Sequence, residues 1–102
     1  MIQLSNDFKQ DHLVRESRAE YSYDYYPWGE YVVVAPGVCG GRPTFKGTRL
    51  EVQVILDHMA SGWSVDELVQ EYHRSGLTKE AISEAVRLAA EALTSKAEAI
   101  AA

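Results

Sequence analysis

With 102 residues, the chain is long enough for one small domain, and its net charge is −5 at pH 7. The acidic balance argues against strong unaided binding to nucleic acid, because neutralised phosphates supply most of the non-specific affinity. A single cysteine excludes an intrachain disulfide, and neither a secretory leader pattern nor a long apolar run is present, so we expect a cytoplasmic protein that does not span a membrane.

Residues 1–30 are predicted to be an N-terminal extension of the domain. A short amphipathic helix is expected around Asp7–Ser17, with a loose arm as the alternative. Tyr21, Tyr23 and Tyr25 then alternate with polar residues, which is typical of a strand with one aromatic face. We expect this row of tyrosines to pack against the domain or a partner rather than to stack on nucleic-acid bases.

Residues 31–50 connect that strand to the helical part of the chain. The β-branched run Tyr31–Ala35 predicts a second strand, and a hairpin through Pro27–Gly29 is the simplest arrangement of the two. Residues 36–50 then hold four of the seven glycines and two of the three prolines, so the backbone must turn tightly more than once. The predicted turn residues are Gly37, Gly40, Gly41, Pro43 and Gly47.

Within this glycine-rich stretch, residues 43–50 are expected to form a small two-stranded ribbon around Gly47, with Phe45 facing inward. Residues 31–49 carry three basic side chains and no acidic one, namely Arg42, Lys46 and Arg49. Two interpretations of these cations stay open. They either pair with turn carbonyls and helix acids, or they bind an acidic partner surface or a phosphate backbone.

Three helices are predicted in the second half of the chain. The first begins near Val52 and ends at Gly62, and its apolar side chains recur at intervals of three and four residues. Ser64 opens the second helix with the pattern of a capping box. Thr78 caps a third helix of roughly sixteen residues with a regular apolar stripe. The tail at residues 96–102 has little to pack against, and we expect it to fray.

Together these elements predict an α+β fold, mainly α with a small β part, in which residues 31–95 form a β-ribbon and a trihelical helix-turn-helix domain. Such a domain suggests DNA binding, but the third helix argues against it. Its predicted exposed face combines three acidic and two basic side chains: Lys79, Glu80, Ser83, Glu84, Arg87 and Glu91. Because acidic side chains face phosphates at a cost, this surface is a poor reader of the major groove.

No catalytic, metal or cofactor site is predicted. The three histidines, His12, His58 and His73, lie in separate segments without metal-ligand spacing. Cys39 has no histidine placed by the sequence to activate it, so we expect a small buried residue rather than a reactive thiol. The glycine pair that follows Cys39 lacks the spacing of a phosphate-binding loop.

Two segments of the chain resemble a known family. Val38–Pro43 (VCGGRP) and Phe45–Val52 (FKGTRLEV) look like the signature of the domain-of-unknown-function family number 433, and the resemblance continues over about residues 31–93. Glu51 stands where the family pattern usually has proline, and either residue suits the first turn of a helix.

The resemblance implies a homeodomain-like trihelical fold preceded by a β-ribbon, and a role as the antitoxin of a VapB-like toxin–antitoxin pair. It also implies a PIN-like nuclease as the partner, with operator DNA bound together with that partner, and we expect a homodimer. The expected partner-binding or nucleic-acid-binding side chains are Arg42, Lys46, Arg49, Lys79, Ser83 and Arg87. A free-standing helix-turn-helix regulator and a homodimeric interaction module are the alternatives.

Overall fold

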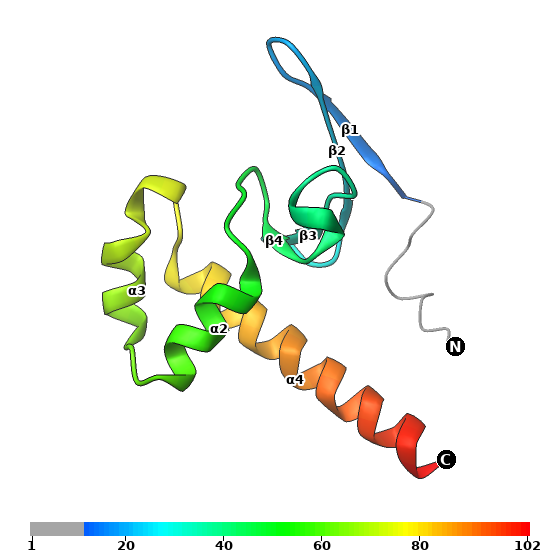
Figure 1. The fold of residues 1–102 in the computed structure, drawn as a ribbon, viewed down its shortest axis with the longest axis vertical. Coiled ribbons are helices and arrows are strands. Elements are labelled where there is room, and N and C mark those ends of the chain that lie inside the picture. Colours follow the sequence, from blue (N-terminus) through cyan, green and yellow to red (C-terminus); the bar gives the residue numbers. More distant parts are fainter. Residues whose placement is uncertain (1–11) are drawn as a thin grey trace.

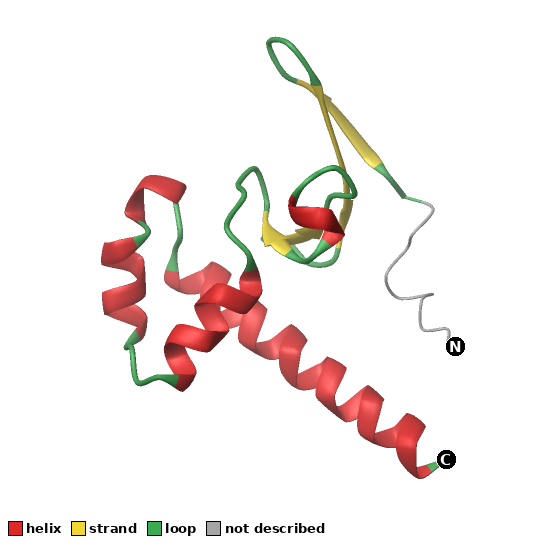
Figure 2. Cartoon of the chain, in the orientation of Figure 1, coloured by secondary structure: helices red, strands yellow, loops and turns green. Residues whose placement is uncertain are grey.

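The computed structural model describes residues 12–102 and has an α+β fold, which confirms the predicted class (Figure 1, Figure 2). An antiparallel sheet in the order β1-β2-β3-β4 precedes three α-helices. The strands are β1 (Val14–Ser17), β2 (Ser22–Pro27), β3 (Val32–Val34) and β4 (Thr44–Phe45), and the helices are α2 (Val52–Ala60), α3 (Val65–Glu71) and α4 (Lys79–Ala101). Two short 3₁₀ turns, η1 (Cys39–Gly41) and η2 (His73–Ser75), lie in the connections.

The first strand corrects the helix expected around Asp7–Ser17. Val14–Ser17 form β1, which pairs antiparallel with β2 so that Val14 lies opposite Tyr25. Its side chains alternate between half-buried and exposed, which is the two-residue period of a strand rather than the period of a helix. Pairing with the tyrosine-rich strand satisfies backbone groups that a short isolated helix would leave to water. Residues 7–11 of the expected helix lie outside the described residues.

The predicted hairpin between the two central strands is confirmed. β2 pairs antiparallel with β3, with Tyr26 opposite Val34, so the hydrogen bonding runs across the predicted boundary between residues 30 and 31. Tyr23 and Tyr25 are buried, and they pack with Val33 and Ala35 into a small core beneath the hairpin. The β1–β2 hairpin projects from the helical part of the molecule (Figure 1).

The glycine-rich stretch forms a turn that brings β4 back to β3. Val32 lies opposite Phe45, and the chain then reverses over Phe45–Thr48, where Thr48 N donates to Phe45 O at 3.0 Å. The return arm of the expected ribbon is reduced to a single bridge between Thr44 and Glu51. Phe45 faces inward as expected and joins the main core. The short return arm lets α2 begin at Val52, directly after the bridge.

The three predicted helices are present, and their main core lies where they meet the sheet. Ile55 of α2, Leu68 of α3 and Ile82 of α4 are almost completely buried in it. The capping box at Ser64 is confirmed, since its hydroxyl accepts from Glu67 N at 3.0 Å. The tail at residues 96–102, which we expected to fray, instead continues α4 to Ala101, and this half of the helix extends away from the other elements (Figure 1).

A buried carboxylate, that of Glu84, connects α4 to the sheet. The prediction that Glu84 lies on the exposed face of this helix is therefore wrong. Glu84 is only 8% exposed. Its carboxylate accepts backbone N–H groups from Glu30 at 2.7 Å, Tyr31 at 2.7 Å and Val32 at 2.9 Å. Gly29 leaves room for it, because a Cβ atom there would lie 2.5 Å from the Glu84 carboxylate. The start of β3 thus satisfies a charge that helical periodicity alone places at the surface.

Candidate functional site

Arg42 forms an ion pair with Glu51. Its Nε and Nη2 donate to the two carboxylate oxygens of Glu51 at 2.9 and 3.0 Å. These hydrogen bonds hold the pKa of Glu51 below its ordinary value and raise the pKa of the Arg42 guanidinium. The fork geometry fixes the η1 turn against the start of α2. Pairing with a helix acid, one of the two interpretations considered for the cations, therefore describes Arg42.

Lys46 and Arg49 are exposed on the same turn. The Lys46 ammonium lies 5.6 Å from the centroid of the Tyr25 ring, a cation–π distance. Burial and then the hydrogen bond that Tyr25 donates to Glu16 raise the pKa of this phenol. Within residues 12–102 the Arg49 guanidinium has no ion-pair or hydrogen-bond partner. These two cations remain accessible to a partner.

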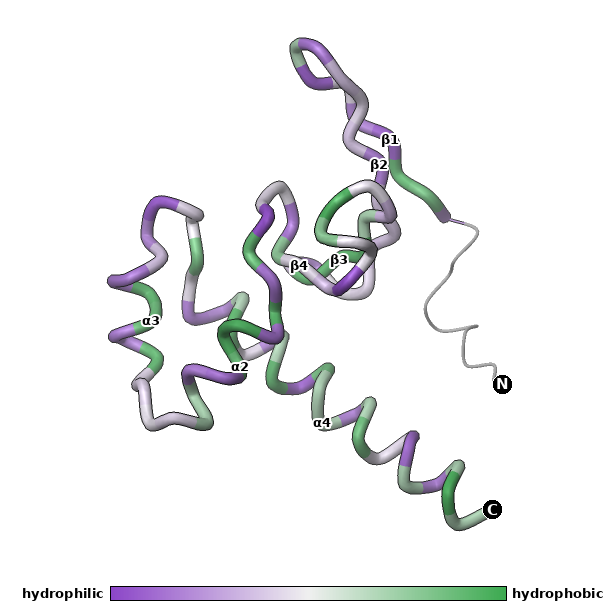
Figure 3. The backbone as a smooth tube through the Cα atoms, in the orientation of Figure 1, coloured by the Kyte–Doolittle hydropathy of each residue, from purple (hydrophilic) through white to green (hydrophobic). Residues whose placement is uncertain are grey.

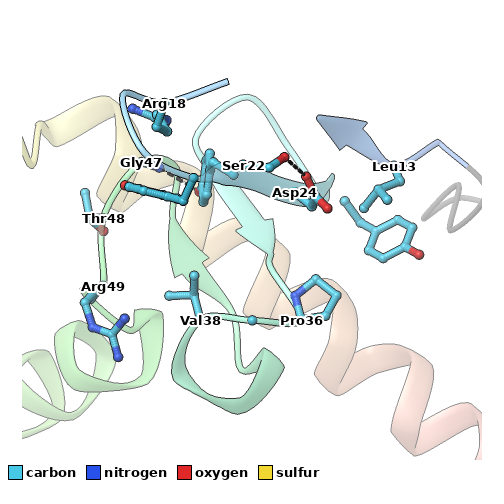
Figure 4. A pocket seen from close by; sticks show the side chains of 13 residues that line it. Leu13, Arg18, Ser22, Asp24, Pro36, Val38, Gly47, Thr48 and Arg49 are labelled. Atoms are coloured by element: carbon cyan, nitrogen blue, oxygen red, sulfur yellow. Dashed lines mark hydrogen bonds between the residues drawn. The ribbon is translucent and has the colours of Figure 1, made fainter. Parts of the chain in front are cut away.

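Arg49 lines a hollow of about 550 Å³ that lies between the β1–β2 hairpin and the glycine-rich turns (Figure 4). We call it the tyrosine hollow, and it is defined here by Arg18, Tyr21, Tyr23, Tyr26, Val38 and Arg49. Arg18 enters from the end of the hairpin, and its guanidinium lies 4.7 Å from the Tyr23 ring centroid. The acidic side chain at the rim, Asp24, is engaged by Arg15 at 3.3 Å and by the Ser22 hydroxyl.

Sequence reasoning missed Arg18 as a member of this surface. It belongs to the N-terminal extension and lies far in sequence from Arg49, so no local spacing links the two. The turn residues do shape the hollow. Gly37 and Gly47 line it, and Gly47 N donates to the Tyr23 hydroxyl at 2.8 Å. With φ at +78°, Gly47 occupies a left-handed conformation that glycine adopts without strain.

Of the other predicted turn residues, Gly40 and Gly41 form η1 with positive φ angles of 66° and 84°. Pro43 follows directly, and its carbonyl accepts from Val52 N at 3.0 Å, which ties the turn to the first residue of α2. Cys39 is half-buried rather than buried, and its thiol donates to Arg49 O at 3.4 Å. These contacts make the stretch a shaped connection between β3 and α2.

Lys79, Ser83 and Arg87 do come together, but on a different surface from the tyrosine hollow. They line an open groove of about 980 Å³ at the start of α4, which we call the α4 groove. Glu30, Asp66 and Glu80 line the same groove. Arg87 also lies 3.7 Å from Glu91 within the helix. The mixed charge of the α4 groove is unfavourable for a phosphate backbone.

His58 packs against two aromatic side chains. His58 stacks on Trp63 with 4.5 Å between ring centroids, and its Nε2 lies 3.0 Å from the Tyr72 hydroxyl. Among residues 12–102, no group of three or more histidine, cysteine or acidic side chains is arranged to hold a metal ion. Nor does any helix in this part of the chain combine the length and apolar character needed to cross a bilayer.

The family model described as "Protein of unknown function (DUF433)" matches residues 32–89, which is more than half of the chain. The chain belongs to the DUF433 family. The match begins at the first residue of β3 and ends within α4, so in this DUF433 member β1 and β2 precede the family region. No curated protein and no solved structure matches the chain.

Proposed function

We propose that this DUF433 member is a non-enzymatic, antitoxin-like protein that binds and neutralises a PIN-like nuclease through the tyrosine hollow. The observation that carries the proposal is the composition of that surface. Tyrosine and arginine are the residues most enriched among the side chains that dominate binding energy at protein interfaces. Here three tyrosines and two arginines surround one hollow on a chain whose net charge is −5.

A protein partner suits this surface better than nucleic acid does. The hollow offers the Arg49 guanidinium together with that of Arg18, which lies over Tyr23 and also donates to Glu16 at 3.3 Å. Aromatic rims of this kind exclude water around a docked side chain. The net charge of −5 favours approach to a basic, RNA-cleaving partner and disfavours a long contact with phosphates. The nuclease class is the one that the resemblance to antitoxins implies.

In this proposal operator DNA is bound by the complex of this chain with the nuclease, and not by this chain alone. We infer that α2, α3 and α4 act as a homeodomain-like helix-turn-helix in which α4 faces the DNA. Lys79, Ser83 and Arg87 would then contact phosphates, while the partner supplies the positive charge that the α4 groove lacks. The cytoplasm is the compartment in which a nuclease and its antitoxin would meet.

Co-expression with the product of the neighbouring gene tests the proposal. The wild-type chain is expected to co-purify with a nuclease and to suppress its RNA cleavage. The double variant Arg18→Glu/Arg49→Glu is expected to lose both the complex and the suppression, because both cations of the tyrosine hollow are reversed. Arg74→Glu/Lys79→Glu is the matched control, since it reverses two exposed cations that do not line the hollow.

Three results would contradict the proposal: no complex with any nuclease, a neighbour without a nuclease fold, or a complex that the double variant leaves intact. Measuring DNA binding to the upstream region at increasing salt distinguishes the proposed antitoxin-like protein from a free-standing regulator. Such a regulator binds DNA without the partner and loses affinity steeply as salt rises. The proposed complex is expected to shift this DNA, whereas the isolated chain does not.

A further inference from the structure

The C-terminal half of α4 extends beyond the core, and no other element within residues 12–102 packs over it. Every residue from Ala90 to Ala101 is exposed, with Leu93 at 73% and Ile100 at 74%. An isolated helix of about twelve residues is marginal in water, because the nucleating turn is costly and most helical stability in proteins comes from packing an apolar face. This half of α4 therefore lacks the contact that normally stabilises a helix of its length.

Its apolar residues form a regular seam. Val86, Leu93 and Ile100 recur at intervals of seven residues, and Ala90 and Ala97 each lie four residues after one of them. Side chains with this spacing share one face of a helix in the manner of a coiled coil. Figure 3 shows apolar positions recurring along α4 to its C-terminal end. We call these five residues the α4 seam.

We propose that the α4 seam is a homodimer interface in which α4 packs antiparallel against α4 of a second copy, with the two helices crossing at Leu93. The seam is self-complementary, as a two-fold interface requires, because a crossing at Leu93 sets this residue against its own copy and brings the large residues at the two ends of the seam together. A crossing at Leu93 sets Val86 against Ile100 of the second copy. The small alanines allow the two helices to approach closely.

The charges beside the seam distinguish a second copy in antiparallel orientation from a parallel pair. Arg87 and Glu98 lie on the same flank of the helix, six residues before and five residues after Leu93. An antiparallel crossing at Leu93 therefore brings each Arg87 close to Glu98 of the other copy, twice per dimer. A parallel pair instead keeps each Arg87 about 16 Å along the axis from Glu98 of the other copy, so the two cannot pair.

The helix pair is long enough to keep the two cores apart, and it leaves the tyrosine hollow available. At 1.5 Å per residue, the segment from Val86 to Ala101 is about 24 Å long, so the two cores would lie at opposite ends of the helix pair. The α4 seam shares no residue with the tyrosine hollow. Dimer formation and capture of a nuclease are therefore separable, and failure of one leaves the other standing.

Light scattering on the full chain across a concentration series tests the dimer. The wild-type mass is expected to approach twice 11.4 kDa as concentration rises. Leu93→Asp is expected to weaken dimerisation by more than about tenfold, because it places a charge at the centre of an apolar contact. Ser95→Asp is the matched control, since it adds the same charge on the opposite face of α4. Helical circular dichroism at low concentration verifies that both variants fold.

A charge exchange tests the orientation. Arg87→Glu is expected to weaken the dimer a few-fold, and Arg87→Glu/Glu98→Arg to restore it, because residues eleven apart on one helix cannot pair with each other. In a Cys39→Ser background, Val86→Cys mixed with Ile100→Cys is expected to cross-link on oxidation, whereas Val86→Cys alone is not.

Three results would overturn the proposal. The first is a monomer at every concentration, and the second is cross-linking of Val86→Cys with itself. The third is that the wild-type chain is monomeric and the Leu93→Asp variant no longer captures the nuclease. That result would assign the seam to the nuclease instead of a second copy.

Discussion

Replacing Glu84 with alanine would remove the acceptor of three backbone N–H groups at residues 30–32. Glu30 is exposed, so its N–H can turn to water, but the Val32 N–H is buried and the Tyr31 N–H is partly buried. Each buried donor left without a partner costs about 1–3 kcal/mol, so we expect Glu84→Ala to destabilise the fold by about 2–5 kcal/mol. That is a large share of the roughly 5–15 kcal/mol that stabilises a typical domain.

Glutamine at the same position separates the hydrogen bonds from the volume of the side chain. Its carbonyl oxygen can replace Oε1, which accepts from both Tyr31 and Val32, and only the bond from Glu30 is lost. The remaining bonds become neutral, and neutral hydrogen bonds are weaker than charge-assisted ones. We expect Glu84→Gln to cost about 1–2 kcal/mol, clearly less than alanine.

Gly29→Ala tests the same contact from the side of the sheet. The new Cβ atom would lie 2.5 Å from Glu84 Cδ and must displace a carboxylate that is tied by three hydrogen bonds, so we expect a cost of about 1–3 kcal/mol. In the Glu84→Ala background the obstructing atoms are absent, and the same substitution should be nearly neutral. The expected coupling between the two sites is therefore about 1–3 kcal/mol.

Urea unfolding, followed by circular dichroism and by the fluorescence of the two tryptophans, measures all four members of this cycle. Costs that add to within about 0.5 kcal/mol would refute the argument, because independent sites add in this way. A Glu84→Gln variant as unstable as Glu84→Ala would show that the three hydrogen bonds do not act as described.

Three further predictions concern the helices and their connections. Arg42→Ala is expected to raise the pKa of Glu51 toward its ordinary value of 4.5, as seen by NMR titration. Because the lowered pKa stabilises the fold above pH 4.5 and this contribution is lost as pH falls through the folded-state pKa, the stability gap between wild type and variant should close in acid. Ser64→Ala should cost about 1 kcal/mol in urea unfolding through loss of the capping bond, and an equal cost for Ser61→Ala would contradict this reading. Leu68→Ala, at a site with no exposure, should cost about 2–5 kcal/mol, and a smaller loss would mean that the core collapses around the gap.

The helices and their caps could be predicted from the sequence because their signals are local. The apolar residues of α2 recur with the helical period, and Ser64 and Thr78 cap α3 and α4 by bonds to residues three positions away. The β2–β3 hairpin was likewise readable, since alternating tyrosines and a β-branched run flank a proline and a glycine. In each case the residues that determine the element lie within it or beside it.

Three features escaped prediction because their causes lie far apart in the chain. Glu84 has the position of an exposed helical residue, and only the N–H groups more than fifty residues earlier explain its burial. The strand β1 has no strong period of its own and depends on pairing with β2. Likewise, Arg18 and Arg49 meet around the tyrosine hollow only after the sheet has formed, so the sequence indicated one of these cations and missed the other.

The attachment of Glu84 to the start of β3 also constrains when the protein can become functional during its synthesis. The chain must grow by 54 residues after Glu30 before the acceptor of the Glu30 N–H exists. At translation rates of about 5–20 residues per second, this interval lasts about three to eleven seconds. During that time the start of β3 lacks the Glu84 carboxylate, so a surface built on the finished sheet becomes available only after residue 84 has been made.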